Sequence, residues 1–438
     1  MIVLFVGLLF LVGASFNVLL LIRMDVRQMD FMDGILIGQV YYIVLPMLFF
    51  LLTGVVQISG LFLGYWLYDD LQGTAVILCG LFLLPLLRLL LPRSSLHAPD
   101  TSDPRMVWVM VCLFLATGVL SFALSGLGSG GHWQGNLDAA FGNPLFLPTK
   151  FAANIARNVV FAGLLYAVVV KRLRPASAIT LGAVLALFDL ATTFNRITAV
   201  YLLLMVLLIL KNRPWRMLLV GGASLTALSL VSGWWPVFRG LATRQGYTIE
   251  SFARAWDLTQ RAQADTMGTL DTALNGVFES SNLVVLNWIV NNYGTQEQPH
   301  LVYAMFLRPL TVLLPGSIWP DRPTTMSVEL GSAIAGVEGL ALNSTVYGEA
   351  FANFGWFWPL GLAAFLAGAH LLFRSLSPQA RVVQMMGAFV AIAFWRFDSS
   401  YLGCSAVMLG LVVAGLRLTR PPSRRQPVPL FQLLGDVR

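Results

Sequence analysis

Arginine side chains occur at unusual places in this sequence, and they are the residues with the clearest chemistry. Arg157, Arg196 and Arg396 lie at or inside the ends of apolar segments, where a charge is costly unless it faces the protein interior or a wet cavity. Guanidinium groups stay charged and bind phosphate oxygens in pairs. With Arg239 and Arg244 of the segment FRGLATRQGY, these arginines predict a site for a lipid-linked phosphate or pyrophosphate.

Three of these arginines also have a structural interpretation. Arg157 could extend its side chain to the lipid headgroups at the membrane surface. Arg196 could form an ion pair with Asp189, seven residues before it, and Arg396 could form one with Asp398. For each of these three arginines, the structural interpretation and the phosphate-binding interpretation both stay open at the level of the sequence.

The composition indicates what must hold these residues in place. The chain has 438 residues, of which 57% are hydrophobic and 11% charged, whereas roughly a quarter of the residues in an average soluble domain are charged. The excess apolar side chains need lipid around them, and they show no period-2 alternation, so an all-α integral membrane protein is expected. About eleven apolar segments are candidate transmembrane helices: 2–22, 35–56, 74–91, 107–125, 151–170, 177–193, 197–210, 217–236, 355–373, 382–395 and 400–416.

The apolar run 177–210 is interpreted as two short spans. A single helix of that length would measure about 50 Å, which is too long for one crossing. The two spans are expected to meet near Asn195 and Arg196. The stretch 57–73 ends in Asp69 and Asp70 and is interpreted as a segment at the outer membrane surface.

Basic residues predict how the chain crosses the membrane. If the N-terminus lies outside, 18 of the 28 lysines and arginines fall in loops on one side, and basic loops face the cytoplasm. The net charge of +7 then needs no nucleic-acid partner. Four parts follow: transmembrane helices 1–8 (1–237), a large outer loop region with short helices and a re-entrant segment (238–343), transmembrane helices 9–11 (344–418), and a basic cytoplasmic tail (419–438).

Several common catalytic motifs are absent from the sequence. It has no phosphate-binding loop of the G-x-x-x-x-G-K-[ST] type, no G-x-S-x-G motif and no D-x-D pair in the outer loop. The four histidines are scattered, without the spacing of metal ligands. We therefore expect neither a metal nor a cofactor.

The segment from Arg308 to Gly355 is the most distinctive part of the chain. It contains WPDRP, and then YGEAFANFGW at the beginning of an expected span. This segment resembles the Wzy-type O-antigen and oligosaccharide repeat unit polymerases. DFMD before the second span, FNRI, the large outer loop and WRFD near the end are similar to that family in layout.

The resemblance implies a GT-C-like fold and a glycosyltransferase of the bacterial inner membrane with a periplasmic active site and a cytoplasmic C-terminus. Donor and acceptor would be oligosaccharides linked to undecaprenyl pyrophosphate, and the carrier would be released as undecaprenyl pyrophosphate. A chain-length regulator and a flippase are the further partners that it implies. The lipid bilayer is the remaining partner.

Residue roles follow from this resemblance. Arginines would stabilise the departing pyrophosphate without a metal, and a carboxylate would act as base toward the attacking sugar hydroxyl. Glu349 is the first candidate for the base, with the alternative that it merely favours a helix N-terminus; Glu338 and Glu279 are weaker candidates. The expected catalytic residues are Glu349, Arg308, Arg322 and Asp321; the expected pyrophosphate ligands are Arg196, Arg239, Arg244, Arg396 and Arg157; the expected sugar ligands are Tyr347, Asn353, Trp319 and His300.

Two other functions stay open. An O-antigen ligase would carry out the same chemistry with lipid A core as the acceptor, and that alternative would require an outer histidine such as His300. A flippase for lipid-linked oligosaccharides usually has two similar halves, which this sequence lacks.

Overall fold

The structure is a computed structural model, and it describes residues 2–48, 71–93, 100–125, 143, 145–193, 197–246, 248–265, 281–311, 319, 325–336, 341–377 and 379–419. Within these ranges the chain is helical and contains no strand. Eight of the described helices are long and apolar enough to cross a membrane: Leu4–Arg23, Phe31–Leu48, Leu71–Leu90, Arg105–Leu124, Pro148–Val169, Pro175–Thr192, Thr345–Leu376 and Ser399–Leu418. The expectation of an α-helical membrane protein is therefore confirmed.

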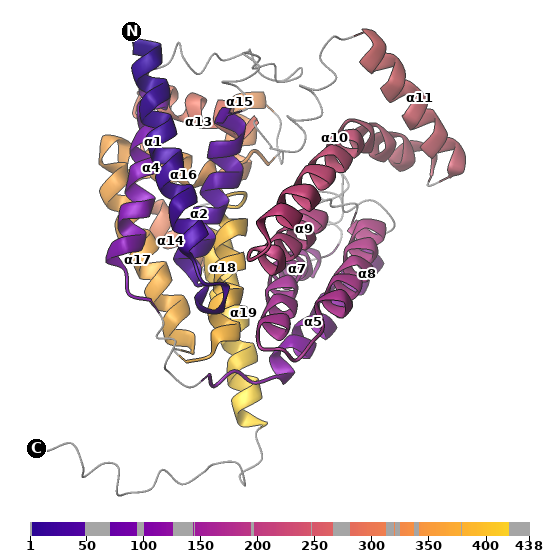
Figure 1. The fold of residues 1–438 in the computed structure, drawn as a ribbon. Helices are drawn as coiled ribbons and strands as arrows, with labels where there is room; N and C mark the ends of the chain where they lie inside the picture. Colours follow the sequence, from indigo (N-terminus) through magenta and orange to yellow (C-terminus); the bar gives the residue numbers. More distant parts are fainter. Residues whose placement is uncertain are drawn as a thin grey trace, which may run out of the picture.

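The helices form two groups that pack side by side (Figure 1). The first group contains α1 (Ile2–Arg23), α2 (Phe31–Gln39) with the π-helical turn that continues it (Val40–Val44), α4 (Leu71–Leu90), α13 (Ser281–Asn292), α14 (Ala304–Thr311), α15 (Met326–Ala335), α16 (Thr345–Phe354), α17 (Trp358–Leu376), α18 (Arg381–Phe394) and α19 (Ser399–Leu418). The second contains α5 (Arg105–Ser125), α7 (Phe146–Val169), α8 (Pro175–Thr193), α9 (Ile197–Leu210), α10 (Pro214–Gln245) and α11 (Ile249–Asp265).

Helix α18 joins the two groups. Every residue from Val382 to Phe394 is buried, because α18 packs against α2 on one side and α7 on the other. The outermost helices have the opposite character. On α1, Leu4, Phe5 and Leu8 are exposed, as expected of side chains that face lipid.

The expected number of eleven spans is not confirmed. The segments 197–210 and 382–395 correspond to the apolar helices α9 and α18, which are shorter than a full crossing. The segment 217–236 lies within α10, which is not among the eight membrane-length helices. Residues 177–210 form two helices, α8 and α9, that pack together, as the two-span interpretation expects; their junction at 194–196 lies outside the described residues.

Helix α10 extends beyond the expected end of the eighth span. The boundary at 237/238 was placed where polar residues begin, but the helix continues to Gln245 and ends at Gly246, whose φ is +86°. Trp234 stacks on Phe238 across this boundary, so aromatic packing carries the helix past the apolar segment. The other expected boundary, at 343/344, is close to the beginning of α16 at Thr345.

The chain bends between α16 and α17. A straight helix over Thr345–Leu376 would be about 48 Å long, but a 3₁₀ turn at Gly355–Phe357 interrupts it. Gly355 has a φ of +53°, which favours glycine. At the bend the ring of Trp358 lies 5.5 Å from that of Tyr347, and α16 packs against α13 and α17 and is buried along its length.

Candidate functional site

Arg308 is held against the beginning of α19 by a close helix contact. It belongs to α14, and only 1% of the residue is exposed. Gly403 on α19 permits this approach, because a Cβ at that position would lie 2.1 Å from the carbonyl oxygen of Pro309. A side chain at position 403 would therefore push the segment that carries Arg308 away from α19.

Two carboxylates bind the Arg308 guanidinium. Its Nη1 donates to Oε1 of Glu349 at 3.2 Å, and its Nη2 donates to Oε2 of Glu329 at 3.0 Å. Glu349 on α16 is fully buried, whereas 30% of the Glu329 side chain on α15 is exposed. Glu329 is therefore the carboxylate through which this cluster reaches the surface.

The N-terminus of α19 completes the environment of Glu349. The Ser399 amide donates to Oε2 of Glu349 at 2.9 Å, and the Ser399 hydroxyl donates to Oε1 at 2.7 Å. Asp398 caps the same helix by accepting from the Ser400 amide. The other Asp398 oxygen, Oδ2, is buried and has no hydrogen-bond partner among the described residues.

Asn353 connects Glu349 to α14. Its side-chain amide donates to the Glu349 carbonyl oxygen at 2.7 Å, and its side-chain oxygen accepts from the Met305 amide at 2.9 Å. The four residues Arg308, Glu329, Glu349 and Ser399, with Asp398 and Asn353 beside them, are called the Arg308 cluster below. Four helices and one helix cap supply it, and so the helix packing fixes its geometry.

Negative charge exceeds positive charge within the described part of this cluster. Burial alone would lower the pKa of Arg308, but the Glu349, Glu329 and Asp398 carboxylates outweigh burial and raise this pKa above its usual value. Burial and the Glu329 carboxylate also raise the pKa of Tyr293 to about 12. Arg308 is therefore a permanent cation that orients the carboxylates around it.

Arg157 has a separate partner near the same end of α19. Its Nε and Nη2 contact the two carboxylate oxygens of Asp189 at 2.6 and 2.8 Å, and both residues are buried. The adjacent Asn158 donates to the Tyr401 hydroxyl. Arg157 is thus a partner of Asp189 that the sequence did not indicate, while Arg196, the partner that the sequence suggested, lies outside the described residues. Binding of pyrophosphate by Arg157 would have to compete with this ion pair.

Two of the expected sugar ligands are core residues. Tyr347 is fully buried, accepts a hydrogen bond from Gln39 and packs against Trp358 and Trp395. Asn353 is buried between α14 and α16, as described above. Sugar binding by Tyr347 would require these helices to separate, and for both residues it stays an untested prediction.

His300 fills the space beside the bend at Gly355. Its Nδ1 lies 3.3 Å from the Ala352 carbonyl oxygen, and a Cβ on Gly355 would lie 2.8 Å from its Nε2. This packing explains the residue structurally. Trp319 is half-buried.

Several expected site residues are not described. Arg196, Asp321, Arg322, Glu338 and Glu279 lie outside the described residues. Arg239 and Arg244 lie in the last part of α10, but the positions of their side chains are not described. Arg396 is half-buried and lies two residues before Asp398. The structure therefore brings together Arg308 and Glu349, and leaves the full arginine set a prediction.

Sequence reasoning missed Glu329, Asp398 and Ser399 as members of the cluster. Glu329 was one of nine acidic residues in the outer loop, and Ser399 follows the WRFD segment. The available signal was Asp398, which directly precedes the apolar helix that begins at Ser399, because aspartate is a preferred residue at a helix N-cap. Nothing in the sequence indicated which helix would lie opposite.

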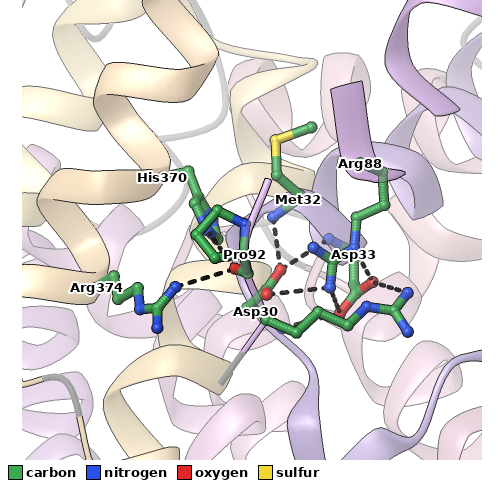
Figure 2. Close-up of polar contacts among 8 residues, drawn as sticks. Asp30, Met32, Asp33, Arg88, Pro92, His370 and Arg374 are labelled. Carbon is green, nitrogen blue, oxygen red and sulfur yellow. Dashed lines mark hydrogen bonds and ion pairs between the residues drawn. The ribbon is translucent and has the colours of Figure 1, made fainter. Parts of the chain in front are cut away.

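A second buried charged cluster joins the beginning of α2 to the last part of α4 (Figure 2). Arg88 of α4 contacts Asp30 and Asp33 at 3.1 and 2.9 Å, and all three are buried. Asp30 and Asp33 also form a reciprocal cap at the beginning of α2. His370 and Arg374 of α17 both contact the Pro92 carbonyl oxygen, at 3.1 Å each. Arg88 is therefore a buried link between α2 and α4.

The fold and the two clusters define an α-helical membrane protein with buried arginine–carboxylate pairs at both ends of its bundle. No protein-family model, curated protein or solved structure matches the chain. Among the described residues, no group of three or more histidine, cysteine or acidic side chains could hold a metal ion.

Proposed function

We propose that the protein is a membrane glycosyltransferase that joins oligosaccharide units carried on undecaprenyl pyrophosphate. In this proposal the reaction takes place at the outer face of a bacterial inner membrane, and the C-terminus is cytoplasmic. The sugar chain passes from its carrier to a hydroxyl of a second lipid-linked unit, and undecaprenyl pyrophosphate leaves. The observation that supports it most is the Arg308 cluster, in which a buried arginine orients a surface-reaching carboxylate.

The cluster suits the acceptor half of this reaction. An attacking hydroxyl must lose its proton as the new bond forms, and a carboxylate held in position can accept that proton. Glu329 is the partly exposed carboxylate, and Arg308 fixes one of its oxygens. Glu349 is the first candidate for this base in the sequence analysis. However, it is buried, and both of its carboxylate oxygens already accept hydrogen bonds from Arg308 or Ser399. We therefore give Glu349 the role of positioning Arg308.

The diphosphate half of the reaction needs cations other than Arg308. The excess of carboxylates around Arg308 would repel a pyrophosphate, because like charges at close range are unfavourable in a medium of low dielectric constant. Arg196, Arg239, Arg244, Arg322 and Arg396 remain the candidates for this role. The chain-length regulator and the flippase belong to the same proposal as partners.

Deletion of the gene in the bacterium that encodes the protein tests this function. Loss of a polymerase leaves single repeat units attached to their acceptor, which a gel of the surface polysaccharide resolves as one short species. Loss of a ligase leaves full-length chains on the carrier, and loss of a flippase leaves neither. Only the first pattern is compatible with the proposal.

Complementation of the deletion then tests the site. We expect Glu329→Gln to leave short species although the protein is present in the membrane, and Arg308→Lys to reduce chain length strongly. Glu250→Gln on the exposed face of α11 is the matched control and should restore full chains. Normal chain length in Glu329→Gln would remove Glu329 from the proposed reaction.

A further inference from the structure

A pocket of about 270 Å³ gathers three cations at the end of the molecule opposite the Arg308 cluster. Arg27 comes from the 3₁₀ turn Val26–Gln28, Lys171 follows the end of α7, and Arg381 is the first residue of α18. Tyr166 of α7 lies beside them. The remainder of the lining, Val169, Val170 and Met385, is apolar, so none of the described residues that line this pocket is a carboxylate.

Two acids lie beside the pocket without lining it, and each accepts hydrogen bonds from lining residues. Asp100 accepts from the Ser102 amide at 3.0 Å, from the Tyr166 hydroxyl at 2.8 Å and from the Arg381 amide at 3.3 Å. Asp25 accepts from the Arg27 amide at 2.9 Å. Within the described part of the chain, neither Arg27 nor Lys171 forms a side-chain ion pair. The described lining therefore carries three positive charges and no negative one, with the Asp100 and Asp25 carboxylates just outside it.

Lys171 has a backbone conformation that normally belongs to glycine. Its φ is +59°, and the Arg172 amide donates back to the Ala167 carbonyl oxygen at 2.8 Å, which closes the end of α7. A left-handed conformation is unfavourable for a non-glycine residue, and glycine is the usual residue at this place after a helix. Such an outlier is a reason to look for a function of the side chain.

We propose that this pocket binds the phosphate group of an anionic ligand. Two guanidinium groups and an ammonium group can surround phosphate oxygens with charge-assisted hydrogen bonds. The apolar wall formed by Val169, Val170 and Met385 suits the beginning of a lipid tail. A headgroup of the surrounding leaflet and a free phosphate compound share this chemistry, and the experiment separates them. The proposal does not depend on the glycosyltransferase function.

A general excess of basic residues on the cytoplasmic side does not predict this geometry. That excess guides insertion and needs only charges distributed over the loops. Here three cations from different parts of the chain line one pocket, and one of them occupies a strained backbone position. A matched basic residue outside the pocket therefore distinguishes the two explanations, and Arg216 near the beginning of α10 is exposed and suitable.

Binding is measured on the full-length protein purified in a neutral detergent. Phosphatidylglycerol, phosphatidylcholine and inorganic phosphate are titrated separately. Native mass spectrometry counts the bound lipid, and thermal unfolding reports stabilisation by each ligand. The pocket variants are Lys171→Gly and Arg27→Gln/Arg381→Gln, and the control variant is Arg216→Gln. Lys171→Gly keeps the favourable backbone and removes only the side chain, so its melting temperature without ligand should equal or exceed that of the wild type.

We expect phosphatidylglycerol to bind more tightly than phosphatidylcholine, with affinity falling about fivefold for each cation removed from the pocket. Arg216→Gln should bind as the wild type does. If inorganic phosphate also stabilises the wild type and not the pocket variants, a free phosphate compound is a source of the ligand. If only phosphatidylglycerol does so, the source is the lipid. Absence of any preference for the anionic lipid, or an equal loss in Arg216→Gln, would overturn the proposal.

Discussion

Replacement of Glu349 by glutamine is the sharpest perturbation of the Arg308 cluster. The two side chains have nearly the same shape, but glutamine has one acceptor oxygen and one donor amide. In the wild type, Oε1 accepts from Arg308 and the Ser399 hydroxyl, while Oε2 accepts from the Ser399 amide. The glutamine amide group would therefore face the Arg308 guanidinium in one orientation and the Ser399 amide in the other, and in both cases two hydrogen-bond donors would meet.

The expected cost follows from which contacts survive. A hydrogen bond to a charged group contributes about 1.5–3 kcal/mol, and removal of one partner from a buried ion pair costs about 3–5 kcal/mol. Arg308 keeps its contact with Glu329 in the variant, so the lower part of this range applies. We expect Glu349→Gln to lower the free energy of unfolding by about 2–3 kcal/mol.

A double variant tests whether Arg308 is the shared element. Glu329→Gln alone should cost about 1 kcal/mol or less, because the Glu329 side chain is partly exposed. With both glutamates replaced, Arg308 stays buried without either carboxylate, so the combined loss should exceed the sum of the single losses by about 1 kcal/mol. Additive losses would show that the two carboxylates act independently of Arg308.

Denaturant unfolding in detergent, followed by tryptophan fluorescence, measures these differences. Glu250→Gln on exposed α11 is the control, with an expected change within about 0.5 kcal/mol. The reasoning is refuted if Glu349→Gln unfolds at the same denaturant concentration as Glu250→Gln, because a buried carboxylate with three donors cannot then be present at this position.

Three further predictions concern other parts of the molecule. Arg88→Met should lower the free energy of unfolding by about 3–5 kcal/mol, since it leaves the buried Asp30 without its arginine and Asp33 with only the 3.9 Å contact to Arg93; a loss below about 1 kcal/mol in denaturant unfolding would contradict the buried link between α2 and α4. Gly403→Ala should push α14 away from α19. In the complementation assay it should therefore shorten the surface polysaccharide as much as Arg308→Lys does. Gly415→Ala is the control and should have no effect, because there is open space around Gly415. Lys171→Gly without ligand should raise the free energy of unfolding by about 1 kcal/mol, and a decrease would show that the turn does not strain lysine.

The sequence predicts the helices well because lipid imposes a simple constraint on composition. A span needs about 20 apolar residues, and such runs can be found in the sequence without knowing which helices pack against each other. The break between α8 and α9 followed from length alone. The end of α10 did not, because the stacking of Trp234 on Phe238 extends the helix into a polar segment. The bend at Gly355 was also hidden, because apolar residues continue on both sides of it.

The site is predictable only where a residue carries its own signal. Arg308 and Glu349 attracted attention as charges beside apolar segments, and the structure places them in contact. Their further partners, Glu329 and Ser399, come from elements whose packing depends on side-chain shapes across four helices. Arg88 shows the same limit, since a charge near the end of a span can face solvent or the interior, and only its contact with Asp33 decides between them.

The two buried arginines differ in a way that bears on function. Arg88 and both of its aspartate partners are buried, and the partly exposed member beside them is a cation, Arg93, at 3.9 Å from Asp33, so the main effect of that cluster is to fix α2 against α4. Arg308 is equally buried, yet one of its partners, Glu329, reaches the surface. A carboxylate that touches solvent can meet a substrate hydroxyl, whereas the buried Asp30 and Asp33 cannot. This asymmetry is the physical reason to place chemistry at Glu329 and not at Asp30 or Asp33.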